Sequence, residues 1–436
     1  MNSGSAVLQD AGQTLPGEGM SAFPSVPRAR RPRIDSVDLL RGLVMVIMLL
    51  DHTRDFVHSD TFKFDPTDMS RTYPALFFTR WLTHFCAPVF VFLAGTGAYF
   101  QIARGKSKGE LSRFLITRGL WLIFLEFTAV RFLAFWEFGI TSFLGGMQVI
   151  WALGWSMIVL AALIHLPLRV IAAFGIAMIA LHNLLDSVTV TQWNGPGTPI
   201  PGITSKLWII LHQGGGFPVA GFPGPFIFFL YPLIPWLGVM AAGYAFGSIF
   251  NEAPAERRRW LLKWGAAITV GFLLLRATNL YGDPGDWSVQ KSAAMTAVSF
   301  LNLQKYPPSL LYLMMTLGPA LLMLGAWERY NDRTGSELPG GWGGALVTFG
   351  RVPLFFYLLQ WPTAHGAGFL LTLVTGKDTS IYFRTPGPGA PVPPDAGFNL
   401  WVTYAAWIAG VLLLYPLCKW FAGVKARRTD WWLSYL

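Results

Sequence analysis

Charged residues are scarce in this sequence. They make up 13% of its 436 residues, whereas hydrophobic residues make up 53% and the mean hydropathy is +0.45. A soluble protein carries about 25% charged residues, so the composition excludes a soluble globular class. Apolar stretches of about 20 residues, long enough to cross a bilayer, recur along nearly the whole chain. The sequence therefore predicts an integral membrane protein.

Cysteine is also rare. Its two occurrences, Cys86 and Cys418, lie inside apolar runs, which excludes a disulfide framework and a cysteine-based metal cluster. We expect both to be buried packing residues. No group of histidines and carboxylates has the spacing of a metal site, so we expect no metal. The net charge of +10 is not gathered into a nucleic-acid-binding motif, so we expect no nucleic acid partner.

The apolar stretches predict an all-α fold, a polytopic integral membrane helical bundle with about 10 transmembrane helices. We expect a disordered basic N-terminal tail at 1–33, a transmembrane domain at 34–425 and a cytoplasmic C-terminal tail at 426–436. The predicted spans are 35–56, 76–101, 112–136, 147–165, 168–187, 226–249, 259–280, 308–328, 345–374 and 399–421.

The basic residues predict the orientation. With the N-terminus inside, most lysines and arginines outside the spans fall on the cytoplasmic side, as the positive-inside rule requires. Both termini are then cytoplasmic. The longer loops, which are rich in Gly, Pro, Trp and Tyr, face outward, as in Trp193–Gly197 and Thr385–Gly389. Their rings either stack against a polar substrate or anchor the chain at the bilayer interface.

The first span carries a stripe of ionisable side chains, and such groups are functional hypotheses by default. Arg41 and His52 are eleven residues apart, which is about three helical turns, so both point the same way about 16 Å apart. Asp38 lies one turn below Arg41, and Asp55 one turn above His52. A neutral histidine can act as a general base at pH 7. His52 is the favoured base, with Asp55 orienting its ring.

The remaining charges at the end of this span have two readings. Asp51, Arg54, Asp55 and His58 can pair along the helix for small stabilisation. Alternatively, Asp51 and His58 belong to the catalytic group and Arg54 binds the substrate. His58 lies one turn from Arg54, nearer the loop, where it could bind an acceptor or assist proton transfer.

Several segments, in this order, resemble bacterial members of the heparan-α-glucosaminide N-acetyltransferase family, within a broader superfamily of transmembrane acyltransferases. Relatives that O-acetylate bacterial polysaccharides carry Arg, ten residues, then His in the first span, and Arg41 and His52 match that spacing. By position, His58 is the nearest counterpart of the loop histidine of the lysosomal enzyme. The similar segments are Ser36–Gly42, Asp51–Phe56, Phe90–Gly95, Tyr231–Trp236, Lys305–Leu310 and Phe349–Phe355.

The resemblance implies that 34–425 is an acyltransferase domain. It would take an acetyl group from cytosolic acetyl-CoA and pass it to a sugar or other glycan acceptor across the membrane, in a bacterial inner (plasma) membrane. Our hypothesis is that Arg41 and Arg351 hold the CoA phosphates through their planar guanidinium groups. Arg118 is a further candidate, although an arginine at that position can also extend toward lipid headgroups.

Arg80, His84 and His365 are further candidates for substrate binding. Arg80 and His84 are one turn apart near the outer end of the second span, and His365 follows Gln360-Trp361-Pro362. A rival class is a multi-span transporter or flippase with a proton relay, and a third is a non-enzymatic scaffold. The expected partners are the lipid bilayer and the acceptor, with a homodimer as an open alternative.

Overall fold

The computed structural model describes residues 35–136, 143–334, 341–383 and 392–436, together with Met1. The tail predicted at 1–33 lies outside the described residues, apart from Met1. Short 3₁₀ or π segments extend or join several helices. The α-helices are α1 (Asp35–Val57), α2 (Pro74–Leu82), α3 (Cys86–Ala103), α4 (Lys108–Leu125), α5 (Arg131–Phe135), α6 (Val149–Leu163), α7 (Leu168–Leu181), α8 (Ile203–Trp208), α9 (Leu233–Phe246), α10 (Pro254–Thr278), α11 (Ala293–Leu301), α12 (Leu310–Thr334), α13 (Trp342–Arg351), α14 (Pro353–Val374) and α15 (Leu400–Arg427).

The all-α, polytopic prediction is confirmed. Each predicted span overlaps at least one of these helices. Within the described residues, six helical stretches are long and apolar enough to cross a membrane, or seven if the bent pair α13 and α14 forms one span. Helices α1 and α4 carry more charge, and α6 has 15 residues. Large apolar side chains such as Ile176, Leu274 and Leu413 are exposed on the bundle, as lipid contact requires.

A small sheet, which the sequence interpretation did not predict, caps one end of the bundle. Strand β1 (Phe143–Met147) is parallel to β3 (Phe226–Phe229), and β2 (Gly215–Pro218) is antiparallel to β3, so the order is β1-β3-β2. The predicted span 226–249 therefore begins as a strand, and α9 starts only at Leu233. The phenylalanines and the isoleucine of β3 suit a strand, because aromatic and β-branched residues are enriched in strands.

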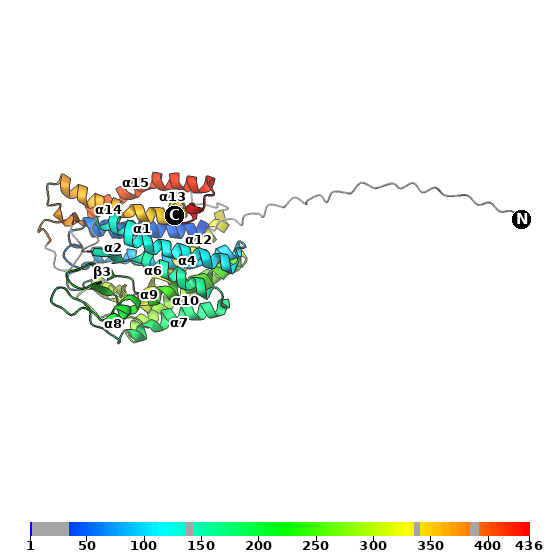
Figure 1. Cartoon of the computed structure of the whole chain (residues 1–436), viewed down its shortest axis with the longest axis horizontal. Coiled ribbons are helices and arrows are strands. Elements are labelled where there is room, and N and C mark those ends of the chain that lie inside the picture. The colour runs from blue at the N-terminus through cyan, green and yellow to red at the C-terminus, as the bar shows by residue number, and fades with distance from the viewer. Residues whose placement is uncertain (2–34, 137–142, 335–340, 384–391) are drawn as a thin grey trace. The chain divides into compact units, whose positions relative to one another are not determined.

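Helix α1 lies among α13, α14 and α15, as Figure 1 shows. Its contact with α13 is made by two glycines, because a Cβ on Gly42 would overlap the carbonyl of Leu346 and a Cβ on Gly350 would overlap that of Asp38. Small residues at such crossings let two helix backbones approach closely. Helices α13 and α14 meet at a bend of 100°, where Pro353 begins a new helix.

The C-terminal segment folds back onto the bundle. Helix α15 runs to Arg427, and a short 3₁₀ segment follows at Trp431–Ser434. Arg118 donates a hydrogen bond to the carbonyl of Ser434. The hydroxyls of Thr117 and Tyr435 are 2.7 Å apart. The segment predicted as a tail at 426–436 is thus packed against α4.

Candidate active site

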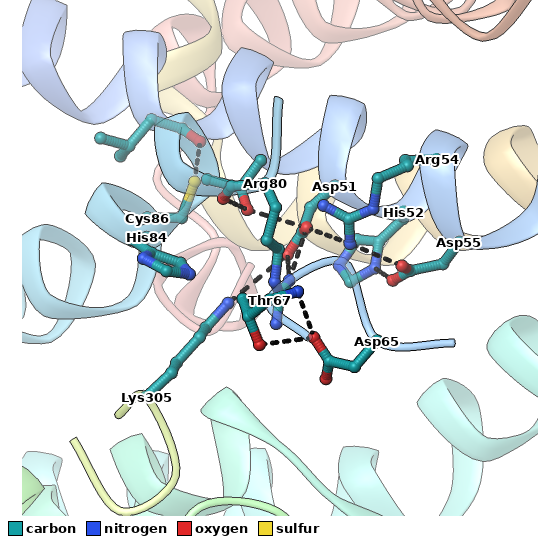
Figure 2. A network of polar contacts seen from close by, with 12 residues as sticks. Asp51, His52, Arg54, Asp55, Asp65, Thr67, Arg80, His84, Cys86 and Lys305 are labelled. Atoms are coloured by element: carbon teal, nitrogen blue, oxygen red, sulfur yellow. Dashed lines mark hydrogen bonds and ion pairs between the residues drawn. The ribbon is translucent and has the colours of Figure 1, made fainter. Parts of the chain in front are cut away.

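A cavity of about 1000 Å³ lies between the C-terminal end of α1 and the small sheet. The last turns of α1 form one wall, and the sheet forms another through glycines of β1 and β2 and phenylalanines of β3. Its lining includes Met48, Asp51, His52, Arg54, Asp55, Arg80, Thr83, Cys86, Trp193, Phe226, Phe228, Tyr231, Lys305, Tyr306, Tyr357 and Trp361. Several of these side chains are drawn in Figure 2.

His52 lines this cavity with its ring held against an aromatic side chain. The centroids of the His52 and Trp361 rings are 3.7 Å apart. His52 Nδ1 lies 3.8 Å from Asp55 Oδ2, which is longer than a hydrogen bond. Within the described part of the chain, His52 Nδ1 has no hydrogen-bond partner. The ring is therefore positioned by stacking and has a carboxylate nearby.

Asp51 is the centre of a cluster of cations. Arg80 Nη1 donates to both of its carboxylate oxygens, at 2.7 and 2.8 Å, and Arg54 Nη2 lies at 2.7 Å. The hydroxyl of Thr83 donates to it at 2.8 Å, and Lys305 Nζ lies 3.6 Å away. Figure 2 shows Arg54, Arg80 and Lys305 around Asp51. Asp51 is thus the shared counter-ion of Arg54, Arg80 and Lys305 at the end of α1.

Asp55 and Arg54 connect this cluster to His52. Arg54 Nη2 donates to Asp55 Oδ1 at 2.7 Å as well as pairing with Asp51. The Asp55 side chain is 40% exposed, whereas that of Arg54 is 2% exposed. Arg54 is thus a buried bridge between two carboxylates. Arg54, Asp51 and Asp55 thus pair with one another, and the same pairs line the cavity.

His58 lies outside the cavity lining. Its Nδ1 is 3.0 Å from the carbonyl of Phe398, and its Nε2 is 3.4 Å from the Tyr73 hydroxyl and 3.5 Å from Asp60 Oδ2. Burial lowers the pKa of His58 below its ordinary value. With both ring nitrogens engaged, His58 ties the end of α1 to the segment before α15.

His84 and His365 also lie outside the cavity lining, whereas Arg80 is part of it. The nitrogens of His365 are 2.8 Å from the carbonyl of Ala134 and 3.0 Å from that of Tyr382. Its ring is also stacked on that of Trp136, with a centroid distance of 4.1 Å. His84 is buried, and neither of its ring nitrogens has a partner among the described residues.

Three arginines predicted to hold CoA phosphates lie away from the cavity. Arg41 donates to Asp38 at 2.9 Å and to the carbonyl of Gly350 at 3.3 Å, and Arg351 donates to Asp35 at 3.3 Å. Arg118 lies close enough to Arg41 for the two charges to repel. The structure therefore gathers these cations near the N-terminal end of α1, but none of them lines the cavity.

Aromatic side chains cover the wall opposite α1. The ring of Trp193 packs on that of Phe226, with centroids 5.2 Å apart, and Tyr231 and Tyr306 pack at 5.2 Å. Trp193 belongs to a loop in which rings were expected to stack against a substrate, and it does line the cavity. The second such loop, Thr385–Gly389, lies outside the described residues.

The family model for heparan-alpha-glucosaminide N-acetyltransferase, catalytic, matches residues 33–277, which is more than half of the chain. The chain belongs to this family. The comparison with curated proteins found no match. The matched region includes α1, the loop with Trp193 and the small sheet, so it contains most of the cavity wall.

This heparan-α-glucosaminide N-acetyltransferase family member is thus an acetyltransferase by family and a membrane protein by the apolarity of its helices. Among the residues that the structure describes, no group of three or more histidines, cysteines or carboxylates is arranged to hold a metal ion. The assignment of individual catalytic residues stays a prediction.

Sequence reasoning missed several residues of the site in this acetyltransferase. Lys305 and Tyr306 lie in a segment that contributes to the family resemblance, but nothing in their spacing shows that they reach α1. A lysine flanked by apolar residues and prolines, as in Leu303–Pro308, was the available signal. Trp361 and Tyr357 gave no signal, because aromatic residues are abundant in every span.

Proposed function

We propose that this protein transfers an acetyl group from acetyl-CoA to a hydroxyl or amine of a sugar or other glycan acceptor. The observation that carries the proposal is His52, whose Nδ1 has no hydrogen-bond partner among the described residues and which lies in a large cavity with one charged and one aromatic wall. A sugar presents hydroxyls to polar groups and its apolar face to aromatic rings, so such walls suit it.

His52 acts as the general base in this proposal. It takes the proton from the acceptor hydroxyl or amine as the acceptor atom attacks the thioester carbonyl. Asp55, 3.8 Å from the ring, stabilises the imidazolium that forms. The carbon–sulfur bond then breaks, and the leaving thiolate receives the proton from His52. No acyl-enzyme is needed, so we favour direct transfer.

In this proposal Arg41, Arg118 and Arg351 hold the phosphates of the donor. Arg41 and His52 belong to one continuous helix, and their separation along it is about 16 Å. That length is comparable to an extended pantetheine arm, so phosphates bound near Arg41 can present a thioester near His52. Arg41 and Arg351 are both partly exposed, as contact with a soluble donor requires.

The membrane orientation is part of the same proposal. The excess of basic residues supports cytoplasmic termini, which would place the three arginines toward the cytosol and the cavity toward the outside. In a bacterial inner membrane, the donor would be cytosolic and the acceptor extracytoplasmic. Cysteines introduced singly at Lys63 and Lys108 should react with an impermeant thiol reagent from opposite sides of sealed vesicles.

The decisive experiment uses sealed vesicles that contain the full chain and labelled acetyl-CoA on the cytoplasmic side. Labelled acceptor on the opposite side supports the acetyltransferase, whereas unmodified substrate crossing intact supports the rival transporter. Arg351→Gln should raise the KM for acetyl-CoA with little change in kcat if Arg351 binds phosphate. An unchanged KM in both Arg351→Gln and Arg41→Gln would contradict the donor site.

A further inference from the structure

The charges around Asp51 do not balance. Three cations, Arg54, Arg80 and Lys305, meet two carboxylates, Asp51 and Asp55, and all five line the cavity. The side chains of Arg54, Arg80, Lys305 and Asp51 are each 12% exposed or less. An excess positive charge at a buried position is unfavourable unless an anion accompanies it.

The loop that faces this cluster does not supply the missing charge. It contributes Lys63 and Asp65 to the cavity lining, one charge of each sign. Oδ1 of Asp65 already accepts hydrogen bonds from the backbone N–H and hydroxyl of Thr67, at 2.8 and 2.7 Å. The excess charge therefore stays with the three cations around Asp51.

The same cations have hydrogen-bond donors to spare. Nε and Nη1 of Arg54 are buried and have no partner in the part of the chain that the structure describes. Arg80 uses Nη1 for both of its bonds to Asp51. Lys305 Nζ is 3.6 Å from Asp51, beyond hydrogen-bond distance, and lies over the Tyr306 ring. Buried donors without partners are unfavourable, so this arrangement suits a ligand that accepts hydrogen bonds.

We propose that Arg54, Arg80 and Lys305 form a subsite for one anionic group, a carboxylate or phosphate, carried by the acceptor sugar. Arginine matches both groups through its planar set of donors. Lys305 adjoins Tyr306, whose ring also lines the cavity, so a sugar stacked there would bring its anionic substituent to the cations. The inference rests on the proposed function and narrows its acceptor to acidic sugars.

The acceptor is a better source of the anion than the donor. The phosphates of CoA are assigned to Arg41 and Arg351, and Arg41 is about 15 to 20 Å from Asp51 and Arg54 along α1. A pantetheine arm that spans this distance places its thioester, not its phosphates, beside His52. The anionic group at Arg54 must then come from the other substrate.

Binding without any acyl donor tests this subsite directly. The purified full chain in detergent micelles is titrated with glucuronate, glucose 6-phosphate and uncharged glucose, and binding is followed by calorimetry. We expect both charged sugars to bind at least about tenfold more tightly than glucose. Their affinity should fall as the salt concentration rises. Lys305→Gln should weaken their binding about tenfold, since one close charge pair is worth about this much.

Two matched variants accompany this measurement. Lys206→Gln removes a cation that lies over Phe217, outside the cavity lining, and should leave binding within about twofold of the wild type. Lys305→Arg keeps the charge and should bind both charged sugars, so it tests the subsite even if Lys305→Gln does not fold. Thermal unfolding of each variant identifies loss of folding.

Five outcomes would overturn the subsite. Glucose could bind as tightly as the charged sugars, or none of the three sugars could bind. Lys206→Gln could weaken binding as much as Lys305→Gln does. CoA alone could displace glucuronate, which would assign the cations to the donor. Lys305→Gln could slow acetyl transfer with unchanged binding, which would assign them to the transition state. Because no donor is present in the titration, failure here leaves the acetyl-transfer assay to decide the proposed function separately.

Discussion

At the N-terminal end of α1, Arg41 donates to Asp38 and a backbone carbonyl, and Gly42 packs against the backbone of α13. At the C-terminal end, His52 and part of Arg54 face a cavity and lack hydrogen-bond partners among the described residues. Arg41 is thus paired with protein groups at one end, whereas at the other end Nδ1 of His52 and Nε and Nη1 of Arg54 have no hydrogen-bond partner among the described residues. Counting the partners of an ionisable residue in a span therefore shows whether its polar atoms are already paired within the protein.

The largest expected effect comes from the end that faces the cavity. His52→Ala should lower the rate of acetyl transfer by about 10²- to 10⁴-fold, the usual contribution of a general base. His58→Gln should keep the rate within about a few-fold of the wild type, because His58 lies outside the cavity lining. Initial rates at saturating acetyl-CoA measure both. If His52→Ala kept full activity and His58→Gln lost it, His58 rather than His52 would be the general base.

Removing a carboxylate at each end sharpens the contrast in stability. Asp51→Ala should lower the free energy of unfolding by about 3 to 5 kcal/mol, because three cations lose their shared buried counter-ion. Asp35→Ala, which loses a more exposed pair with Arg351, should lower it by about 1 kcal/mol or less. Unfolding of the purified variants in detergent measures both free energies. Equal losses of stability would show that burial of the ion pairs does not distinguish the two ends of α1.

Adding one methyl group tests the packing at the N-terminal end. Gly42→Ala should destabilise the protein by about 1 to 3 kcal/mol, because its Cβ would overlap the backbone of α13. Gly97→Ala in α3 is the matched control, since nothing lies within 4 Å of a Cβ there, and it should be neutral or stabilising by up to about 1 kcal/mol. Thermal unfolding measures both, and the same sign for both would contradict the close crossing.

The smallest effect concerns pH. Because burial lowers the pKa of His58 in the folded state, the folded protein binds fewer protons there than the unfolded chain does. The stability associated with neutral His58 is present above the unfolded pKa of about 6.5 and is lost as pH falls toward the lower folded value. Unfolding midpoints at pH 7.5 and 5.5 should therefore differ more for the wild type than for His58→Gln.

Much of the fold could be predicted from the sequence, because apolar runs determine which segments become helices. The stripe on α1 was also readable, since helical spacing sets which side chains share a face. The partners of those side chains could not be predicted. Lys305 reaches Asp51 across a large sequence separation, and only the packing of α12 and the preceding loop brings it there.

The small sheet escaped prediction for a related reason. Segments such as Phe226–Phe229 are as apolar as a span, so hydropathy alone assigns them to the following helix. Strand pairing depends on a second segment far away in sequence, here β1 and β2. The sequence therefore predicted loops where the aromatic wall of the cavity lies. Trp193 was predicted to belong to one of these aromatic-rich loops, and it lines the cavity.

The parallel pairing of β1 with β3 also has a consequence for biosynthesis. A growing chain cannot build this wall until α6, α7 and α8 have emerged and the chain has returned to the same end of the bundle. Lys305, Tyr357 and Trp361 join the cavity later still. A nascent chain that stops near residue 277, where the family match ends, would therefore contain His52 and most of the cavity wall but would lack Lys305, Tyr357 and Trp361.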